Sequence, residues 1–337
     1  MSISKEELLP QDRIFVRDRD WGLSIATLKL VLPAIFLILL SLSYLLLPNV
    51  QPMQGTEQAA IVALIFSGLY LALVVVSRYY PSCKAKLDYK LPLLTAAILI
   101  INLWELFTLK SNIFPMPYFP SIVKILSAFS SDWELLAIGT LYSLRLWAVG
   151  FTIGLFAGIP MGIAMGWYER VHYWVYPVLK VIGPIPAIAW IPIFMAIFPT
   201  SFWASVFLIA FGTWFSVTVM TWSGVSNVNK AYFEVAKTMG ASEMFVLYKV
   251  VLPAALPVIF IGIFKALSIS FIALVSAEML GVKGGLGWYL QWSYGWSQYY
   301  KVYASLVVMA ILFSSITTVL FKIRDKVLIW QKGLIKW

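Results

Sequence analysis

The chain has 337 residues, of which 61% are hydrophobic and 12% are charged, and its mean hydropathy is +0.87. Soluble domains carry about 25% charged and 45–50% apolar residues, so this composition excludes an ordinary water-soluble domain. The formal net charge is +10, but the basic residues stand mostly between long apolar runs. There they mark loops beside a membrane rather than a nucleic-acid surface. The single cysteine, Cys83, excludes an internal disulfide.

Eight apolar runs follow one another along the chain, and each is long enough to cross a bilayer as a helix. A spanning helix needs about 20 mostly apolar residues. The predicted helices are Lys29 to Leu47, Gln58 to Ser77, Leu91 to Leu109, Gly139 to Trp167, Tyr173 to Phe198, Phe202 to Ser223, Ala254 to Leu280 and Tyr303 to Phe321. The sequence therefore predicts an all-α, polytopic membrane protein surrounded by lipid.

The distribution of Lys and Arg predicts which loops face the cytoplasm. An excess of these residues marks cytoplasmic loops, and the segment Pro48 to Gln58 has none. They gather before the first run, between the second and third, and after the last: Arg13, Arg17, Arg19 and Lys29; Arg78, Lys84, Lys86 and Lys90; Lys322, Arg324, Lys326, Lys332 and Lys336. We therefore expect both termini and the loop of Cys83 to be cytoplasmic. No cleavable signal peptide is expected, because a mixed-charge head precedes the first apolar run.

The segment after the third run predicts an amphipathic helix. Ile122, Ile125, Leu126 and Phe129 recur at helical spacing behind Pro120 and Ser121, and such a helix commonly lies in the interface plane. Two interpretations stay open: a strap on the membrane surface, and a docking surface for a partner outside the cell.

Prolines predict that the fifth run is broken or kinked. Pro184 and Pro186 follow Gly183, and Pro192 comes soon after. Proline removes a backbone donor and clashes with the preceding turn. Irregular backbone at membrane depth survives only when it is buried in protein or lines a wet cavity. The break is therefore either a structural kink or part of a translocation pathway.

The predicted cytoplasmic loop from Gly224 to Pro253 is much longer than a connector between two helices needs to be. Its segment from Tyr232 to Tyr248 predicts a short helix with Gly240 near the centre. Glycine permits another backbone to approach closely, which favours contact with a second protein. The alternative is an interfacial helix resting on lipid.

This loop resembles the EAA signature of binding-protein-dependent ABC importer permeases. That signature reads Glu-Ala-Ala, three residues, Gly, nine residues, an aliphatic residue, one residue and Leu-Pro. Here Glu234-Val235-Ala236, Gly240 and Val250-Val251-Leu252-Pro253 match it throughout, except that Val235 replaces the second residue.

Other segments are similar to the nitrate, sulfonate, taurine and bicarbonate branch of that family. They are Pro184-Ile185-Pro186 with Ala189-Trp190-Ile191-Pro192, then Ala277-Glu278-Met279-Leu280, then Gly285-Leu286-Gly287. The branch usually has a basic residue two positions after the glycine equivalent to Gly262. Here that position holds Phe264, and Lys265 follows it.

The resemblance implies a type I importer permease core of six helices over residues 91–337, with the coupling loop at about 224–253. Residues 1–90 would form an N-terminal head with two extra helices that have no counterpart in the common members. The resemblance also implies two permease copies, expected to be a homodimer, in the inner membrane. Two cytoplasmic ATPase subunits would bind the loops, and an external binding protein would deliver a small solute such as nitrate, bicarbonate or a sulfonate.

ATP hydrolysis is expected in a partner protein and not in this chain. It has no G-x-x-x-x-G-K-[ST] phosphate loop, so ATP and Mg would be bound by the ATPase partner, and no cofactor and no catalytic residue are expected here. His172 is the only histidine, which argues against a metal site. The alternative function is a secondary transporter or channel, a class that expects an intramembrane charge relay and often an internal repeat.

The candidate residues form two groups: for ATPase coupling Glu234, Ala236, Gly240, Leu252 and Pro253, and for the substrate pathway Pro184, Pro186, Trp190, Lys265, Ser268 and Glu278. Glu234 is expected to stabilise the start of the loop helix, and Ala236 to be small enough to sit against the partner. A lysine at the middle of a membrane helix costs about 2.5–3.5 kcal/mol on insertion scales, so Lys265 should face a cavity or an acidic partner. Glu278 has the alternative role of structural pairing between helices.

Overall fold

The computed structural model describes residues 21–50 and 53–330. The basic residues Arg13, Arg17, Arg19, Lys332 and Lys336 of the topology argument lie outside the described residues. The residues that the structure describes form helices and short connections, without a strand. Contacts within the chain divide it into two compact units, Met1–Val123 and Lys124–Trp337.

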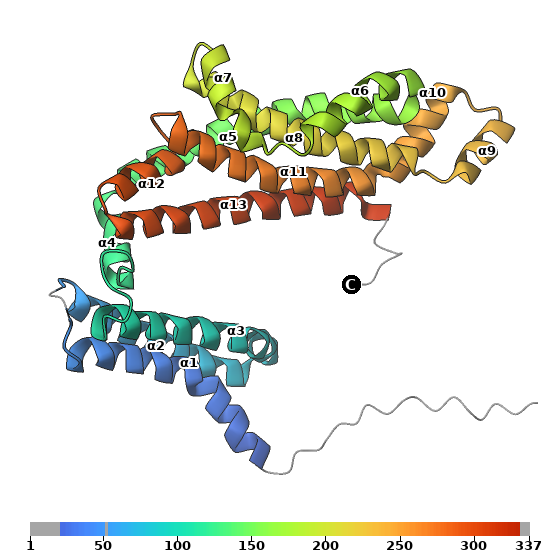
Figure 1. Ribbon diagram of the computed structural model, residues 1–337. Helices are drawn as coiled ribbons and strands as arrows, with labels where there is room; N and C mark the ends of the chain where they lie inside the picture. The colour runs from blue at the N-terminus through green and yellow to red at the C-terminus, as the bar shows by residue number, and fades with distance from the viewer. Residues whose placement is uncertain (1–20, 51–52, 331–337) are drawn as a thin grey trace, which may run out of the picture. The chain divides into compact units, whose positions relative to one another are not determined.

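The first unit is built from three long helices, α1 (Trp21–Leu46), α2 (Thr56–Tyr79) and α3 (Pro81–Glu105) (Figure 1). A π-helical turn, η1 (Leu106–Lys110), continues α3. Polar side chains hold α1 against both neighbours: Tyr70 donates to the Leu30 carbonyl at 2.9 Å, and Asn102 donates to the Phe36 carbonyl at 3.1 Å. The two predicted extra helices thus pack with the third membrane helix.

The second unit contains the long helices that run side by side in Figure 1. Its elements, of which α4 begins at the boundary between the units, are α4 (Ile122–Ser131), α5 (Trp133–Trp167), α6 (Glu169–Ile182), η2 (Ala187–Trp190), α7 (Ile191–Ile197), α8 (Ser201–Ser226), α9 (Lys230–Thr238), α10 (Glu243–Val246), η3 (Leu247–Val251), α11 (Leu252–Leu280), α12 (Leu286–Gly295) and α13 (Tyr299–Val327). The central helix is α8, which packs on α5 and α11. Figure 1 places α9 and α10 at one end of this bundle, and α7 and α12 at the other.

A stripe of glycines lets α5 and α8 approach closely. Gly150, Gly154, Gly158, Gly162 and Gly166 recur every fourth residue and face Ile209, Thr213, Val217, Thr221 and Val225, which recur at the same spacing. A Cβ added at Gly154 would lie 2.5 Å from the Thr213 Cβ and 2.7 Å from the Ala210 carbonyl oxygen. Small residues permit this packing where lipid supplies no hydrophobic drive for helix association. The spacing of the glycines is visible in the sequence, but the close approach depends on the matching residues of α8.

The predicted number of membrane helices agrees with the structure. In the described part of the chain, seven helices are long and apolar enough to span a membrane, and a bent pair supplies an eighth span if it is counted as one. The bent pair is α6 with η2–α7, and its two arms meet at 91°. Its break lies at Gly183–Pro186, as the prolines predict.

Several helices extend beyond the apolar runs that predicted them. α3 begins at Pro81 rather than Leu91, and α5 begins at Trp133 rather than Gly139. Hydropathy marks the part of a helix that lies in hydrocarbon, whereas helical hydrogen bonding continues into polar residues. The division into units by packing, at 123/124, does not test the boundary drawn from the resemblance at 90/91, which stays a prediction.

The predicted amphipathic helix is α4, with a packed face slightly different from the expected one. Ile125 and Ala128 are buried against Ala304 of α13, but Leu126 is 58% exposed. The choice between a membrane strap and a docking surface stays open.

Candidate functional site

The loop between α8 and α11 folds as two helices, which corrects the single helix predicted from Tyr232 to Tyr248. α9 is capped by Asn229, whose side-chain oxygen accepts from the Ala231 amide at 3.0 Å. α10 is capped by Ser242, whose hydroxyl accepts from the Phe245 amide at 3.4 Å. The helices are separate because the chain reverses at Gly240, where φ is +78°.

Gly240 ends α9 in a Schellman motif. Its amide donates to the Lys237 carbonyl at 2.9 Å, and the Ala241 amide donates to the Ala236 carbonyl at 3.1 Å. This pair of bonds requires a left-handed residue, which is usually glycine. A Cβ at Gly240 would meet nothing within 4 Å in this chain. Within the chain, therefore, glycine is needed here for its backbone conformation rather than for space.

One face of α9 packs inward on the bundle. Ala236 is only 8% exposed and belongs to the same core cluster as Val246 and Val251. The Phe233 ring stacks on Trp167, at the end of α5, with centroids 6.0 Å apart. The expectation that Ala236 sits against a partner is therefore wrong: its small side chain lets α9 lie close to α10 and η3.

The outward face of α9 carries three exposed apolar side chains, which we name the α9 stripe: Tyr232 (54% exposed), Val235 (59%) and Met239 (82%). Their spacing of three and four residues places them on one side of the helix. These three residues are not among those predicted from the sequence, although their helical spacing is visible there. Glu234 is exposed, but it is the fifth residue of α9 and Asn229 caps the helix, so the expected role of Glu234 at the helix start is wrong.

Leu252 and Pro253 connect the loop to the bundle. They form the first turn of α11, directly after the π-helical turn η3. The chain is helical on both sides of Pro253, so its missing amide donor falls inside a continuous helical stretch, directly after the π-helical turn η3. The loop therefore enters α11 without an intervening flexible segment.

The break between α6 and α7 borders an apolar cavity of about 270 Å³. Pro186 lines it from the break, Phe211 from α8 and Ile272 from α11, and every lining side chain is apolar. Pro184 is exposed and lies outside the lining. Trp190 is half-buried beside the cavity, with its ring centroid 5.7 Å from that of Phe211.

Lys265 and Ser268 lie on an exposed stripe of α11, which we name the α11 stripe: Ile261, Lys265, Ser268 and Ile272. The Lys265 ammonium contacts the Met220 sulfur at 3.9 Å, and no carboxylate lies within ion-pair distance of it in the described part of the chain. The stripe reaches the apolar cavity through Ile272. Pro186 and Trp190 therefore lie at the apolar cavity, whereas Lys265 and Ser268 lie on the α11 stripe outside its lining.

Glu278 lies apart from these residues, in a buried structural network. Its carboxylate accepts from the Ser143 hydroxyl at 2.6 Å and from the Gly287 amide at 2.8 Å, and the Ser143 hydroxyl accepts from the Leu286 amide at 2.9 Å. A Cβ at Gly285 (φ +98°) would overlap the carboxylate. Glu278 therefore satisfies the Gly287 amide at the start of α12, where a helix favours negative charge, and through Ser143 it joins α11 to α5 and α12.

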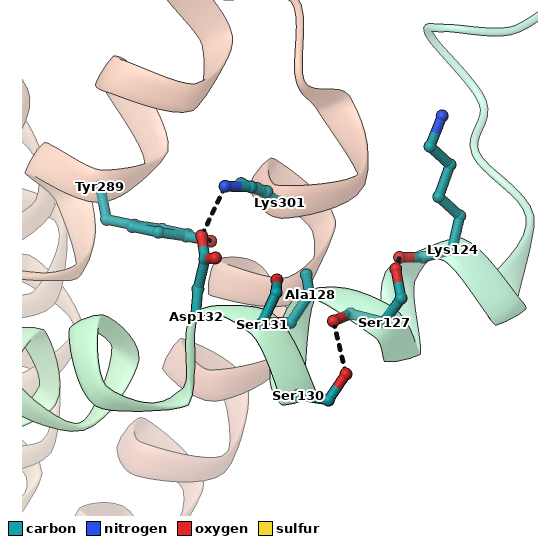
Figure 2. A network of polar contacts seen from close by, with 8 residues as sticks. All are labelled: Lys124, Ser127, Ala128, Ser130, Ser131, Asp132, Tyr289 and Lys301. Atoms are coloured by element: carbon teal, nitrogen blue, oxygen red, sulfur yellow. Dashed lines mark hydrogen bonds and ion pairs between the residues drawn. The ribbon is translucent and has the colours of Figure 1, made fainter.

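A second polar network lies where α4 turns into α5 (Figure 2). Lys301 pairs with Asp132 at 2.7 Å, Tyr289 donates to the same carboxylate oxygen at 2.8 Å, and both charged side chains are less than 15% exposed. Burial would raise the pKa of Asp132, but the hydrogen bonds from Lys301 and Tyr289 outweigh it and hold that pKa below its usual value. No local sequence pattern predicts this network, because its members are up to 169 residues apart, from Asp132 to Lys301.

The sequence profile of the family described as "Binding-protein-dependent transport system inner membrane component" matches residues 150–327. The chain belongs to this family. The match covers α8, the whole α9–α10 loop and α11, which carry the α9 stripe and the α11 stripe. The chain is accordingly a multi-pass membrane permease, and the predicted fold class and importer family are confirmed.

Two curated relatives and one solved structure illustrate the likeness. A putative aliphatic sulfonates transport permease of Bacillus subtilis is 30% identical over 243 residues, which are 69% of this chain and 85% of that protein. A nitrate import permease of Leptolyngbya laminosa is 33% identical over 181 residues, 54% of this chain and 61% of that one. An inward-facing structure of the MetNI methionine ABC transporter matches in fold with a TM-score of 0.50 and 23% identity, over 58% of this chain and 97% of that chain.

Proposed function

We propose that this permease forms the pathway of a homodimeric importer for a small anion, driven by ATPase subunits that are separate chains. ATP and Mg would be bound by those subunits. The end of the bundle that carries α9 would face the cytoplasm, together with both termini. An external binding protein would deliver the cargo at the opposite end.

The α9 stripe is the observation that carries the coupling part of this proposal. Three large apolar side chains stand exposed on a short helix that lies at one end of the bundle. An exposed apolar patch of this kind marks a contact with another protein or with a lipid surface. The Schellman turn and the two caps fix the loop shape, so a partner can bind a preformed surface. The ATPase subunit is the partner that the family implies.

The α11 stripe supports the pathway part of the proposal. Lys265 is 13 residues after the first residue of α11 and 15 before the last, so it lies about 20 Å from either end. An ammonium facing lipid there would cost about 2.5–3.5 kcal/mol. A second permease copy or a hydrated pathway on this face removes that cost. A cation at mid-membrane also suits an anionic cargo, the class named for the sulfonate and nitrate relatives.

Co-purification of the ATPase subunit tests the coupling assignment. Val235→Glu should abolish retention of the ATPase subunit and ATP-dependent uptake, because it places a charge in an apolar contact. Val235→Ile is the matched control and should retain both. Ala236→Glu should instead reduce the yield of folded protein, because Ala236 is buried within the chain. Normal ATPase retention by Val235→Glu would exclude the α9 stripe as the contact.

Uptake without any ATPase subunit distinguishes the alternative of a secondary transporter or channel. Reconstituted vesicles that contain only this chain should show no cargo flux driven by an ion gradient. Gradient-driven flux in such vesicles would favour the alternative.

A further inference from the structure

A cavity of about 450 Å³ lies under the coupling loop, apart from the apolar cavity at the helix break. We name it the loop cavity. The ends of α5 and α8 contribute Trp167 and Ser226 to its lining, while α9 contributes Lys230 and Lys237 and α10 contributes Glu243. Its volume falls in the range of about 300–1,000 Å³ that small-ligand sites occupy.

The chemistry of the loop cavity suits an anion attached to an apolar body. Lys230 and Lys237 are two helical turns apart and therefore share a face of α9. In the described residues, neither side chain makes an ion pair, a hydrogen bond or a ring contact. Phe233 lies between them on the same face of α9, and its ring stacks on Trp167 at the end of α5, so these two rings form an apolar wall beside the lysines. Together with Glu243, the two lysines give the lining a net charge of one positive unit.

We infer from the length of α8 that the loop cavity lies near the level of lipid headgroups. α8 has 26 residues and is therefore about 39 Å long, which matches the 40–45 Å of a bilayer with its headgroup layers. Ser226, the last residue of α8, then falls in one headgroup layer. Trp167 and Tyr168 line the cavity at the same end, and Trp and Tyr are enriched at that depth.

We propose that the loop cavity binds the phosphodiester headgroup of an acidic phospholipid. Lys230 and Lys237 contact the phosphate, and the apolar wall contacts the glycerol and the first acyl carbons. Glu243 accepts from a headgroup hydroxyl, as phosphatidylglycerol provides. A bound headgroup joins α9 to the ends of α5 and α8, and so fixes the coupling loop on the bundle. The lysines of basic pockets between membrane helices recognise acidic lipids in this way.

The geometry favours a lipid over a side chain of the ATPase partner. Lys237 is two residues after Val235, so the two side chains point about 200° apart around α9. A partner docked on the α9 stripe therefore leaves the loop cavity open. This inference is independent of the cargo and of the ATPase contact.

The test titrates the purified full-length chain, in a neutral detergent, with short-chain phosphatidylglycerol, short-chain phosphatidylcholine and glycerol 3-phosphate. The midpoint of thermal unfolding is measured at each concentration. Phosphatidylglycerol should raise the midpoint at the lowest concentration. The Lys230→Gln/Lys237→Gln double variant should need about 30-fold more of this lipid. Lys249→Gln removes one charge from the same loop outside the cavity, and it should respond as the parent does.

Three outcomes would overturn the proposal. An unchanged response of the double variant would place lipid binding elsewhere on this basic protein. An equal response to glycerol 3-phosphate would assign the cavity to a free phosphate compound. Displacement of the lipid response by added ATPase subunit would assign the cavity to the protein partner. The double variant replaces two exposed side chains, so without lipid it should unfold at the parent midpoint. A weaker lipid response of this variant then reports lost binding and not a destabilised fold.

Discussion

The strongest test of the coupling loop is a series of substitutions at Gly240. Two reasons for a glycine at this position can be separated. The Schellman turn requires a left-handed backbone, with φ +78°, and costs a residue with a branched or long side chain about 1–2 kcal/mol. That cost shifts the population of the formed turn by roughly 5–30-fold. Close approach of an ATPase backbone, by contrast, would exclude any side chain.

Asparagine distinguishes these reasons because it tolerates the left-handed region and, like leucine, has a side chain that branches at Cγ. If the turn alone matters, Gly240→Asn should retain the ATPase subunit nearly as the parent does, whereas Gly240→Leu should lose retention and uncouple hydrolysis from transport. If close approach matters, both variants should fail equally. The assays are subunit co-purification and ATP-dependent uptake, with membrane insertion as the control. Parent-like behaviour of Gly240→Leu in both assays would reduce the loop to a connector and refute the reasoning.

Three further predictions concern topology, the first helices and stability. An impermeant thiol reagent should fail to label Cys83 in intact cells; labelling there would contradict the cytoplasmic assignment of its loop. Removal of residues 1–90 should leave an assembled transporter with substrate-stimulated ATP hydrolysis, although it also removes residues 81–90 of α3 and the contacts of α3 with α1. Loss of that stimulation in properly inserted protein would refute an accessory role. Asp132→Asn should destabilise the protein by about 3 kcal/mol, because Lys301 is left mostly buried without its partner. Since the pKa of Asp132 is lowered in the folded state, its contribution is fully present above about pH 5 and is lost as the pH falls through that lowered pKa. A stability unchanged between pH 7 and pH 3 in the parent protein would argue against this.

The sequence predicted features whose cause is local. Pro184 and Pro186 sufficed to place the break between α6 and α7, because a missing amide donor acts on its own turn. The turn after α9 also had a local signal that was not used. Gly240 followed by Ser242 combines a helix-ending glycine with an N-cap residue. Interpreting Gly240 as a contact point instead of a helix end led to one helix where the structure has two.

Features that depend on distant partners could not be derived in this way. Glu278 bonds Ser143, which is 135 residues away, so no local pattern distinguished a structural carboxylate from a pathway carboxylate. The inward direction of Ala236 likewise depends on the position of η3 and α11. The glycine stripe of α5 is an intermediate case: its spacing is visible in the sequence, but its meaning depends on the matching β-branched residues of α8.

The helical stretch from Glu243 to Leu280 physically joins the two parts of the candidate site. It passes from α10 through η3 into α11 without a non-helical residue. At its start it packs on Ala236 of the coupling loop, and farther along it carries Lys265 and Ile272. Gly240 lies just before it, whereas the opposite wall of the apolar cavity comes from a helix that is broken. A displacement applied to α9 therefore reaches the cavity through a continuous helix on one side, while the wall at Pro186 has no such connection. We accordingly expect substitutions at the α9–α10 turn to alter coupling without altering cargo recognition, and substitutions at Lys265 to do the reverse.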